Sequence, residues 1–134
     1  RDYHVSNLMM VNNQIGIIDS QDALIGNRAY DLASLIDDVR FKTSENDKKN
    51  VFDHYLKSQK KMNIKYFKND FEIVSVLRNL KIIGIFTRLA IRDDKREYLK
   101  LIPYAWNLIK LRSKNNDKFE ELNNLLKIFK KNLV

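Results

Sequence analysis

Residues 8–18 read LMMVNNQIGII and consist of two short apolar runs around a polar turn. Asn12 and Asn13 stand at the centre of that turn, and asparagine tolerates the left-handed backbone that a tight turn requires. The stretch therefore predicts a β-hairpin. Because both runs are apolar throughout, both faces of the hairpin are expected to be covered.

From Tyr30 onward the apolar residues recur at helical spacing instead. Ser44 indicates the start of one helix, and residues 71–91 are apolar nearly all round, which predicts a central buried helix. Gly84 stands inside that central helix, where glycine costs about 1 kcal/mol relative to alanine. Close packing against another helix would explain its presence.

Two further signals concern the second half of the chain. Pro103 is expected to kink or split a helix over residues 97–111. A last helix is expected to begin with a capping box formed by Asp117 and Glu120. The sequence thus predicts a mainly helical fold with one small β-hairpin, in a single domain over residues 1–134.

The chain is basic, with 25 lysine and arginine residues against 17 aspartate and glutamate residues and a net charge of +8. A basic helical module that binds nucleic acid is one function compatible with this charge. The basic residues are scattered rather than gathered in one stripe, which favours an ordinary solvated surface and no nucleic-acid partner. The sequence has no cysteine, and a cytoplasmic location is the default expectation. No apolar run approaches the roughly 20 residues of a membrane helix, so no membrane partner is expected.

Three side chains around the hairpin are of the types that phosphoryl transfer needs. Asp2 and Asn7 precede the hairpin, and Asp19 follows it. Because a hairpin returns the chain to the end where it began, the two carboxylates and the amide are expected in one cleft. In this interpretation Asp2 accepts the proton of the acceptor hydroxyl, while Asn7 and Asp19 hold Mg²⁺ against the phosphates of ATP. By spacing alone, a second interpretation is equally open: Asp2 and Asn7 could be capping or turn residues, and Asp19 could simply end a strand.

Several stretches resemble one family. Residues 1–8, RDYHVSNL, are similar to the catalytic loop of aminoglycoside phosphotransferases and choline kinases, and residues 17–19, IID, resemble the end of their metal-binding strand. The run YDLASL at residues 30–35 strengthens the resemblance. Residues 78–86, RNLKIIGIF, and 98–103, YLKLIP, are similar to bacterial anomeric kinases of N-acetylmuramate and N-acetylglucosamine, which serve peptidoglycan recycling.

The resemblance implies the C-terminal lobe of a protein-kinase-like, aminoglycoside-phosphotransferase fold. Residues 1–31 would supply the catalytic loop, hairpin and metal-binding segment, and residues 32–134 a helical subdomain. It also implies ATP- and Mg²⁺-dependent transfer of the γ-phosphate to a hydroxyl of an amino sugar, with an aminoglycoside or choline as alternative acceptors. Ser20 departs from the family, which usually has phenylalanine at that position.

The family's N-terminal lobe, which carries the lysine that binds the phosphates, would precede Arg1 and is not part of this sequence. The chain is therefore expected to be a fragment of a phosphotransferase that is inactive by itself. Apolar surface made for that lobe is expected to be exposed around the hairpin, which favours self-association.

Four residues are assigned supporting roles. Asp22, just past the proposed metal ligand, and Arg78, on the central helix, are expected to contact the sugar. For Arg78 an ordinary surface or ion-pair role is equally open. His4 is expected to support the catalytic loop, and Asp31 is expected to brace it as a carboxylate at a helix start.

Overall fold

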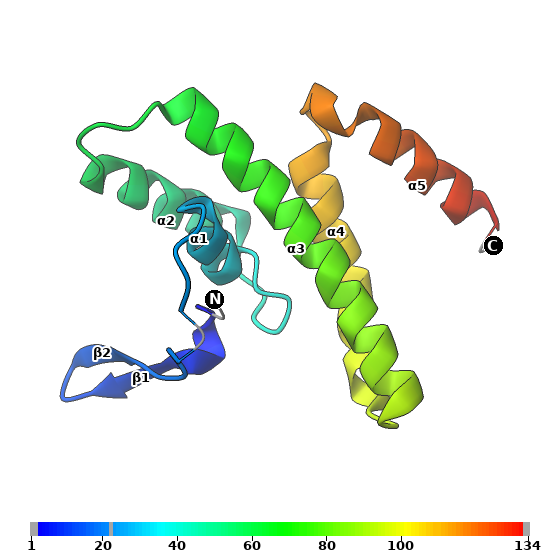
Figure 1. Cartoon of the computed structure of the whole chain (residues 1–134), viewed down its shortest axis with the longest axis horizontal. Helices are drawn as coiled ribbons and strands as arrows, with labels where there is room; N and C mark the ends of the chain where they lie inside the picture. The colour runs from blue at the N-terminus through cyan, green and yellow to red at the C-terminus, as the bar shows by residue number, and fades with distance from the viewer. Residues whose placement is uncertain (1–2, 22, 133–134) are drawn as a thin grey trace.

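The structure is a computed structural model that describes residues 3–21 and 23–132 (Figure 1). In this part of the chain a two-stranded hairpin is followed by five α-helices, with short 3-10 helices at some of the junctions. The elements in order are η1 (Val5–Asn7), β1 (Leu8–Val11), β2 (Gln14–Ile17), α1 (Ala29–Ile36), α2 (Glu45–Ser58), α3 (Ile64–Arg92), η2 (Arg96–Leu101), α4 (Ile102–Ser113), η3 (Asp117–Phe119) and α5 (Glu120–Asn132). The predicted fold class, mainly helical with a small hairpin, is confirmed.

The hairpin forms as the sequence predicts. Strands β1 and β2 pair antiparallel, with Leu8 opposite Ile17. The two turn residues, Asn12 and Asn13, have φ angles of 50° and 60°. Positive φ at both central residues is the requirement of a two-residue type I′ turn, and asparagine meets it at low steric cost.

The expectation that both faces of the hairpin are covered is wrong for the described residues. Met10 and Ile15 are 68% and 66% exposed. Figure 1 shows the hairpin projecting from the helices, which pack on one another instead. A two-stranded ribbon buries little surface by itself, so its apolar side chains stay open to solvent. This agrees with the expected apolar surface around the hairpin, whereas self-association stays a prediction.

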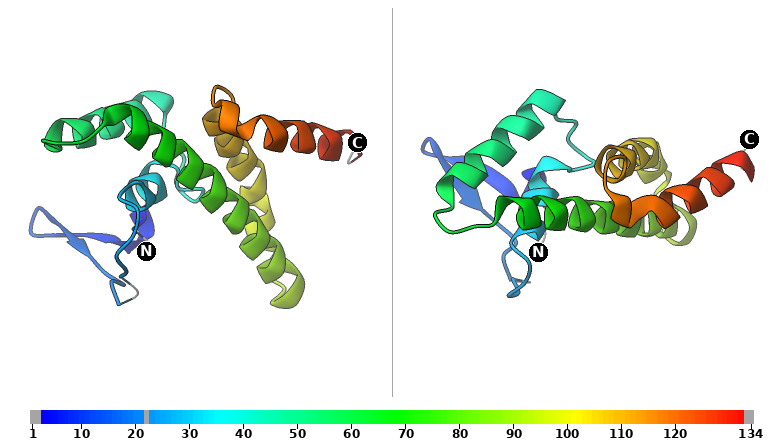
Figure 2. Two further views of the ribbon diagram at one scale, coloured as in Figure 1. Left: turned by 45° about the horizontal axis from the view of Figure 1, so that its top comes forward. Right: turned by 90° about the horizontal axis from the view of Figure 1, so that it is seen from above.

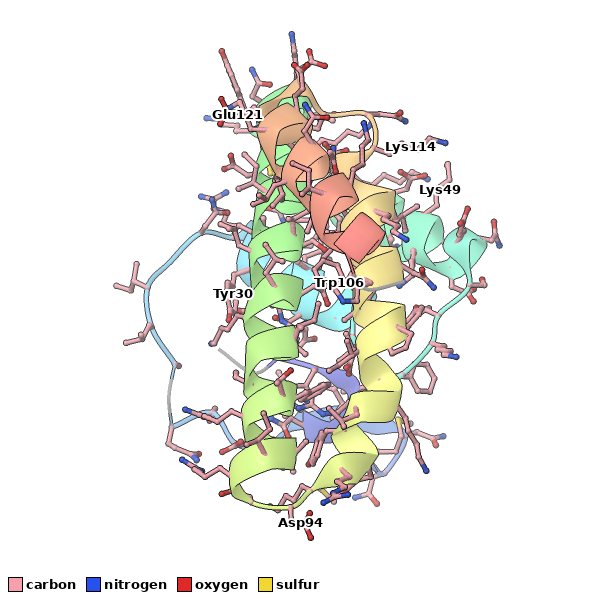
Figure 3. The ribbon with its side chains drawn as sticks, turned by 90° about the vertical axis from the view of Figure 1, so that its right-hand side faces the viewer. Tyr30, Lys49, Asp94, Trp106, Lys114 and Glu121 are labelled. Carbon is pink, nitrogen blue, oxygen red and sulfur yellow. The ribbon has the colours of Figure 1, made fainter. Side chains whose placement is uncertain are left out.

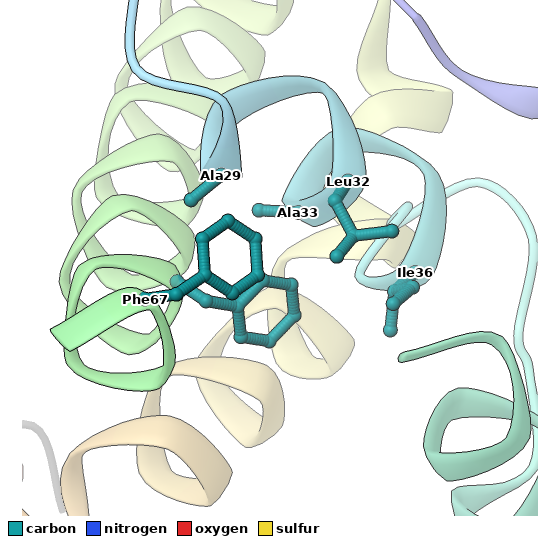
Figure 4. Packing of buried hydrophobic residues seen from close by; sticks show 6 residues of the cluster. Ala29, Leu32, Ala33, Ile36 and Phe67 are labelled. Carbon is teal, nitrogen blue, oxygen red and sulfur yellow. The ribbon is translucent and has the colours of Figure 1, made fainter. Parts of the chain in front are cut away.

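Helix α3 is the axis of the helical part, and Figure 2 shows it running the length of that part. Its first half packs against α1 and α2, where Phe67 and Phe71 bury against α1 (Figure 4). Its second half packs against α4, where Phe86 and Leu108 lie in one cluster. The buried apolar side chains of α3 thus hold α1, α2 and α4 together. One cluster lies between α3 and the pair α1 and α2, and the other lies between α3 and α4.

The central helix is longer and less buried than predicted. It begins at Ile64, because the side chain of Asn63 caps it by accepting from the backbone N–H of Tyr66 at 3.2 Å. It is apolar nearly all round, but only part of its circumference is covered, so Leu77 is 58% exposed. Hydrophobic periodicity predicts a helix reliably, but only neighbouring elements determine which faces are buried.

Three predicted helix boundaries can be compared with the structure. Ser44 caps α2 by accepting from the backbone N–H of Asp47, as predicted. Pro103 splits its helix: η2 ends before it, and it lies in the first turn of α4, where the missing N–H costs nothing. The predicted capping box at Asp117 is wrong, because Asn116 is the capping residue and a 3-10 turn precedes α5.

The explanation of Gly84 by close helix packing is wrong. Gly84 is exposed, and a Cβ atom added to it would have no neighbour within 4 Å. The glycine therefore carries its entropic cost in α3 without a compensating close contact.

Replacing Gly84 with alanine is therefore expected to stabilise the protein by up to about 1 kcal/mol, because alanine has the higher helix propensity and meets no obstacle. Denaturant titration of the wild type and Gly84→Ala would measure the difference in the free energy of unfolding. A destabilised variant would mean that the glycine has a contact or conformation that the structure does not contain.

A buried ionic cluster joins the four helices α1 to α4. The carboxylate of Asp37, at the end of α1, accepts two hydrogen bonds from Arg112 of α4, at 2.8 and 3.0 Å. Ser75 of α3 donates to it at 2.6 Å, and Lys48 of α2 lies 3.2 Å away. We call these residues the Asp37 cluster. Asp37 is fully buried, so the cluster replaces the water that the carboxylate loses on folding.

Candidate active site

The hairpin brings Asn7 and Asp19 together. The backbone N–H of Ile18 donates to the carbonyl of Asn7 at 3.0 Å, which extends the pairing of the strands by one residue. The side chains of Asn7 and Asp19 then lie at the same end of the hairpin, and Nδ2 of Asn7 is 3.4 Å from Oδ2 of Asp19. The predicted approach of these two residues is therefore present in the structure.

Asp19 has an unusual backbone conformation and a second partner. Its φ is 61°, in the left-handed region that aspartate and asparagine tolerate better than most residues. The side-chain amide of Gln21 donates to Oδ1 of Asp19. Sequence reasoning did not single out Gln21. Its position two residues after Asp19 could have indicated the contact, since a polar side chain at that spacing can hydrogen-bond to the Asp19 carboxylate.

The donor atoms of this pair are compatible with Mg²⁺. The ion prefers oxygen ligands and in kinase sites uses one or two carboxylates, with phosphate oxygens and water completing the shell. Asp19 offers a carboxylate, and Asn7 offers an amide oxygen that exchanges places with Nδ2 when the amide turns over. No group of three histidine, cysteine, aspartate or glutamate residues suited to a metal occurs within residues 3–21 and 23–132. The pair alone would therefore need ligands from the nucleotide.

Three other residues, Asp2, Asp22 and His4, were predicted near this site, and the structure describes only His4. Asp2 and Asp22 lie outside the described residues. His4 precedes η1, and its backbone carbonyl accepts from the backbone N–H of Asn7 at 2.9 Å. Its ring atom Nδ1 is buried and has no partner in the described part of the chain. His4 thus contacts the site through its backbone, and the predicted role of its ring stays a prediction.

Asp31 lies in the first turn of α1 and is exposed. Just before this helix start, the side chain of Asn27 accepts from the backbone N–H of Ala29, the first residue of α1, at 2.8 Å. The amide of Asn27 also donates to Asp70 of α3 at 2.9 Å. Asn27 was missed in the sequence, although an asparagine shortly before an apolar helical run is the usual capping signal. The bracing role of Asp31 stays a prediction.

A pocket of about 530 Å³ lies between the segment before α1 and the side of α3. Figure 3 shows Tyr30 beside α3 where that segment passes. We call it the α1–α3 pocket. Its lining comprises Leu24, Ile25, Gly26, Asn27, Arg28, Tyr30, Asp31, Val74, Leu77, Arg78 and Lys81. It therefore combines several apolar side chains with three cations and one carboxylate, and it includes Arg78 and Asp31 from the predicted set.

Arg78 is 7% exposed and makes no hydrogen bond or ion pair with any described residue. Burial lowers the pKa of Arg78, and the charge of Asp38, as the next largest influence, raises it. Arginine nevertheless stays charged at neutral pH because its ordinary pKa is so high. The structure thus places a buried positive charge in the wall of the α1–α3 pocket, and no described carboxylate makes a hydrogen bond or ion pair with it.

Residues 1–63 match the phosphotransferase enzyme family. The sequence is also 32% identical over 111 residues, or 79% of the chain, to an N-acetylmuramate/N-acetylglucosamine kinase from Caulobacter vibrioides. The corresponding protein of Neisseria meningitidis is 34% identical over 116 residues, and that of Pseudomonas aeruginosa 31% over 132 residues. The three alignments cover 31%, 35% and 39% of the relatives.

These matches show that the chain belongs to the phosphotransferase enzyme family, which implies a kinase-like fold. Within that family it is similar to proteins named as kinases of N-acetylmuramate and N-acetylglucosamine, as the sequence motifs predict. The chain spans about a third of the length of these curated relatives. In its described part, no helix is long and apolar enough to cross a membrane.

Proposed function

We propose that the whole protein transfers the γ-phosphate of ATP to the anomeric hydroxyl of N-acetylmuramate or N-acetylglucosamine. The observation that supports this most directly is the approach of Asn7 and Asp19 at the end of the hairpin, inside the segment that matches the phosphotransferase family. The names of the relatives supply the class of sugar. Residues 1–134 would form one domain of the protein, with the site in residues 1–31 and a helical subdomain in residues 32–134.

Asn7 and Asp19 would hold Mg²⁺, which supplies positive charge and a fixed position for the phosphates. Asp2 would accept the proton of the sugar hydroxyl. As that oxygen forms its bond to the γ-phosphorus, the bond from the phosphorus to the bridging oxygen breaks and ADP leaves. The contacts of Gln21 with Asp19 and of the His4 carbonyl with Asn7 would fix the two ligands, because a ligand must already be oriented when the nucleotide arrives.

The proposed base is tested by Asp2→Asn in the whole protein. Turnover is expected to fall by about 10²- to 10⁴-fold, since the variant cannot accept the proton, while the affinity for the sugar changes little. Steady-state kinetics with each sugar would measure turnover, and calorimetry would measure sugar binding. An equal loss of turnover and of sugar affinity would instead assign Asp2 to substrate binding.

The acceptor is tested by comparing N-acetylmuramate, N-acetylglucosamine, choline and an aminoglycoside at equal concentrations. We expect phosphorylation of the two N-acetyl sugars alone, at the hydroxyl of the anomeric carbon, with product position read by phosphorus NMR. Turnover of choline alone would refute the sugar assignment and leave a kinase. No ATP-dependent phosphorylation of any of the four would refute the proposed function.

A further inference from the structure

The α1–α3 pocket follows the proposed metal site along the chain. Its near wall, residues 24–28, belongs to the same connection that begins at Asp19, and its far wall is the side of α3. Its volume of about 530 Å³ is in the range of small-molecule sites, which is about 300–1,000 Å³. A sugar with one bulky substituent fits such a volume.

The charge in the pocket is unbalanced. Arg28, Arg78 and Lys81 line it, and the only described carboxylate in its lining is that of Asp31. Arg28 and Lys81 are exposed, so water solvates them, but Arg78 is 7% exposed. Arginine is seldom buried this far unless it is paired, since losing its hydration is costly. Asp38 acts on Arg78 through its charge but makes no hydrogen bond or ion pair with it, so an anion in the pocket would supply a direct partner.

The apolar part of the pocket lining favours an anion that also carries an apolar group. Leu24, Val74 and Leu77 contribute hydrocarbon surface beside the cations. The lactyl group that distinguishes N-acetylmuramate from N-acetylglucosamine carries one carboxylate and one methyl group. A carboxylate matches the planar guanidinium of arginine, and the methyl group matches the apolar wall.

We propose that the α1–α3 pocket binds the carboxylate of an acidic amino sugar through Arg78, and that this contact makes the enzyme prefer N-acetylmuramate to the neutral N-acetylglucosamine. The proposal rests on the proposed sugar kinase activity. It adds a specificity-determining residue on α3 and a reason for a buried arginine that makes no hydrogen bond with the described residues.

The test is Arg78→Gln in the whole protein, with kcat/KM measured for both sugars and sugar binding measured by calorimetry. The ratio of kcat/KM for N-acetylmuramate to that for N-acetylglucosamine is expected to fall about 10- to 100-fold, as for the loss of one charged hydrogen bond. Arg88→Gln is the matched control, because Arg88 is an exposed arginine of α3 outside the pocket. That variant should keep the wild-type ratio.

Because Arg78 is buried, its variant could be unfolded, which circular dichroism would detect. The double variant Arg28→Gln/Lys81→Gln removes two exposed charges of the pocket and should lower the same ratio by a smaller factor with normal folding. An unchanged ratio in a folded Arg78→Gln protein would overturn the proposal, as would an unchanged ratio in the double variant if Arg78→Gln is unfolded.

The other source of an oxyanion is phosphate. Inorganic phosphate should compete with N-acetylmuramate weakly, and the KM for ATP should be the same in Arg78→Gln and wild type. A raised KM for ATP with an unchanged sugar ratio would assign the pocket to nucleotide phosphate and overturn the proposal. Failure of the wild-type protein to phosphorylate either sugar would refute the proposed function instead, so the two failures are distinguishable.

Discussion

Asp19→Asn is expected to abolish most phosphoryl transfer, with a loss of more than about 100-fold at fixed Mg²⁺. Removing residues that merely orient a metal ligand costs about 10- to 100-fold, and Asp19 is proposed as a ligand itself. Asparagine is the informative replacement because it keeps the size of the side chain and tolerates the φ of 61°. Asp19→Ala would add backbone strain to the loss of the ligand.

The measurements are turnover as a function of Mg²⁺ concentration and calorimetric binding of Mg²⁺–ATP. Asp94→Asn is the matched control, since Asp94 is an exposed aspartate that also has a positive φ, of 50°, and is remote in sequence from the proposed site. Turnover by Asp19→Asn within about threefold of the wild type, with an unchanged Mg²⁺ requirement, would refute the assignment of Asp19 as a metal ligand.

Arg112→Met is expected to produce the largest loss of stability, about 3–5 kcal/mol, because it removes one partner of a buried ion pair and leaves the other charged. Arg112 donates two hydrogen bonds to Asp37, which is fully buried. Methionine keeps much of the packing against Phe71, whose ring lies 4.9 Å from the guanidinium carbon. Chemical denaturation would measure the change in the free energy of unfolding.

Two further variants separate the ion pair from packing. Asp37→Asn combined with Arg112→Met should lose less stability than the sum of the two single losses, because neither member of this pair is then left without the other. Lys48 loses the charge of Asp37 both in Asp37→Asn and in the double variant, so it does not change this comparison. Arg92→Met removes an exposed arginine that pairs with Asp93 through the same two-point geometry, and it should have a far smaller effect. Additive losses at Asp37 and Arg112 would mean that the pair contributes no coupling.

The same cluster predicts a pH dependence. Burial raises the pKa of Asp37, but Arg112, Lys48 and Ser75 together outweigh it, so the pKa is lowered below its ordinary value. A carboxyl whose pKa is lowered by folding stabilises the protein above its ordinary pKa and loses that contribution as the pH falls through the lowered value. The free energy of unfolding should thus decrease on acidification below about pH 4.

Asp37→Asn should lack this part of the acid dependence. In Arg112→Met the burial effect is no longer offset by the guanidinium, so the pKa of Asp37 should rise and the variant should regain part of its lost stability as the pH falls. Denaturant midpoints measured from pH 7 down to acidic pH should fall for the wild type and rise for Arg112→Met. Parallel curves for the wild type and Asp37→Asn would contradict the assignment to Asp37.

The sequence alone was sufficient for features that depend on local chemistry. Two asparagines between apolar runs specify a type I′ turn, because their side chains permit positive φ at both positions. The turn then fixes the register of the hairpin, so Asn7 and Asp19 had to meet at its open end. Ser44 marked a helix start and Pro103 marked a break in a helix for equally local reasons, since a cap and a missing N–H act within one turn.

Features that depend on which surfaces meet were decided only by the tertiary structure. The apolar runs of the hairpin did not reveal that its faces are exposed, and Gly84 gave no sign that α3 has no neighbour there. The partners Asp37 and Arg112 are 75 residues apart in the chain. The strong attraction between Asp37 and Arg112 arises only when packing removes water from them. The same holds for the burial of Arg78, which makes no hydrogen bond with the described residues.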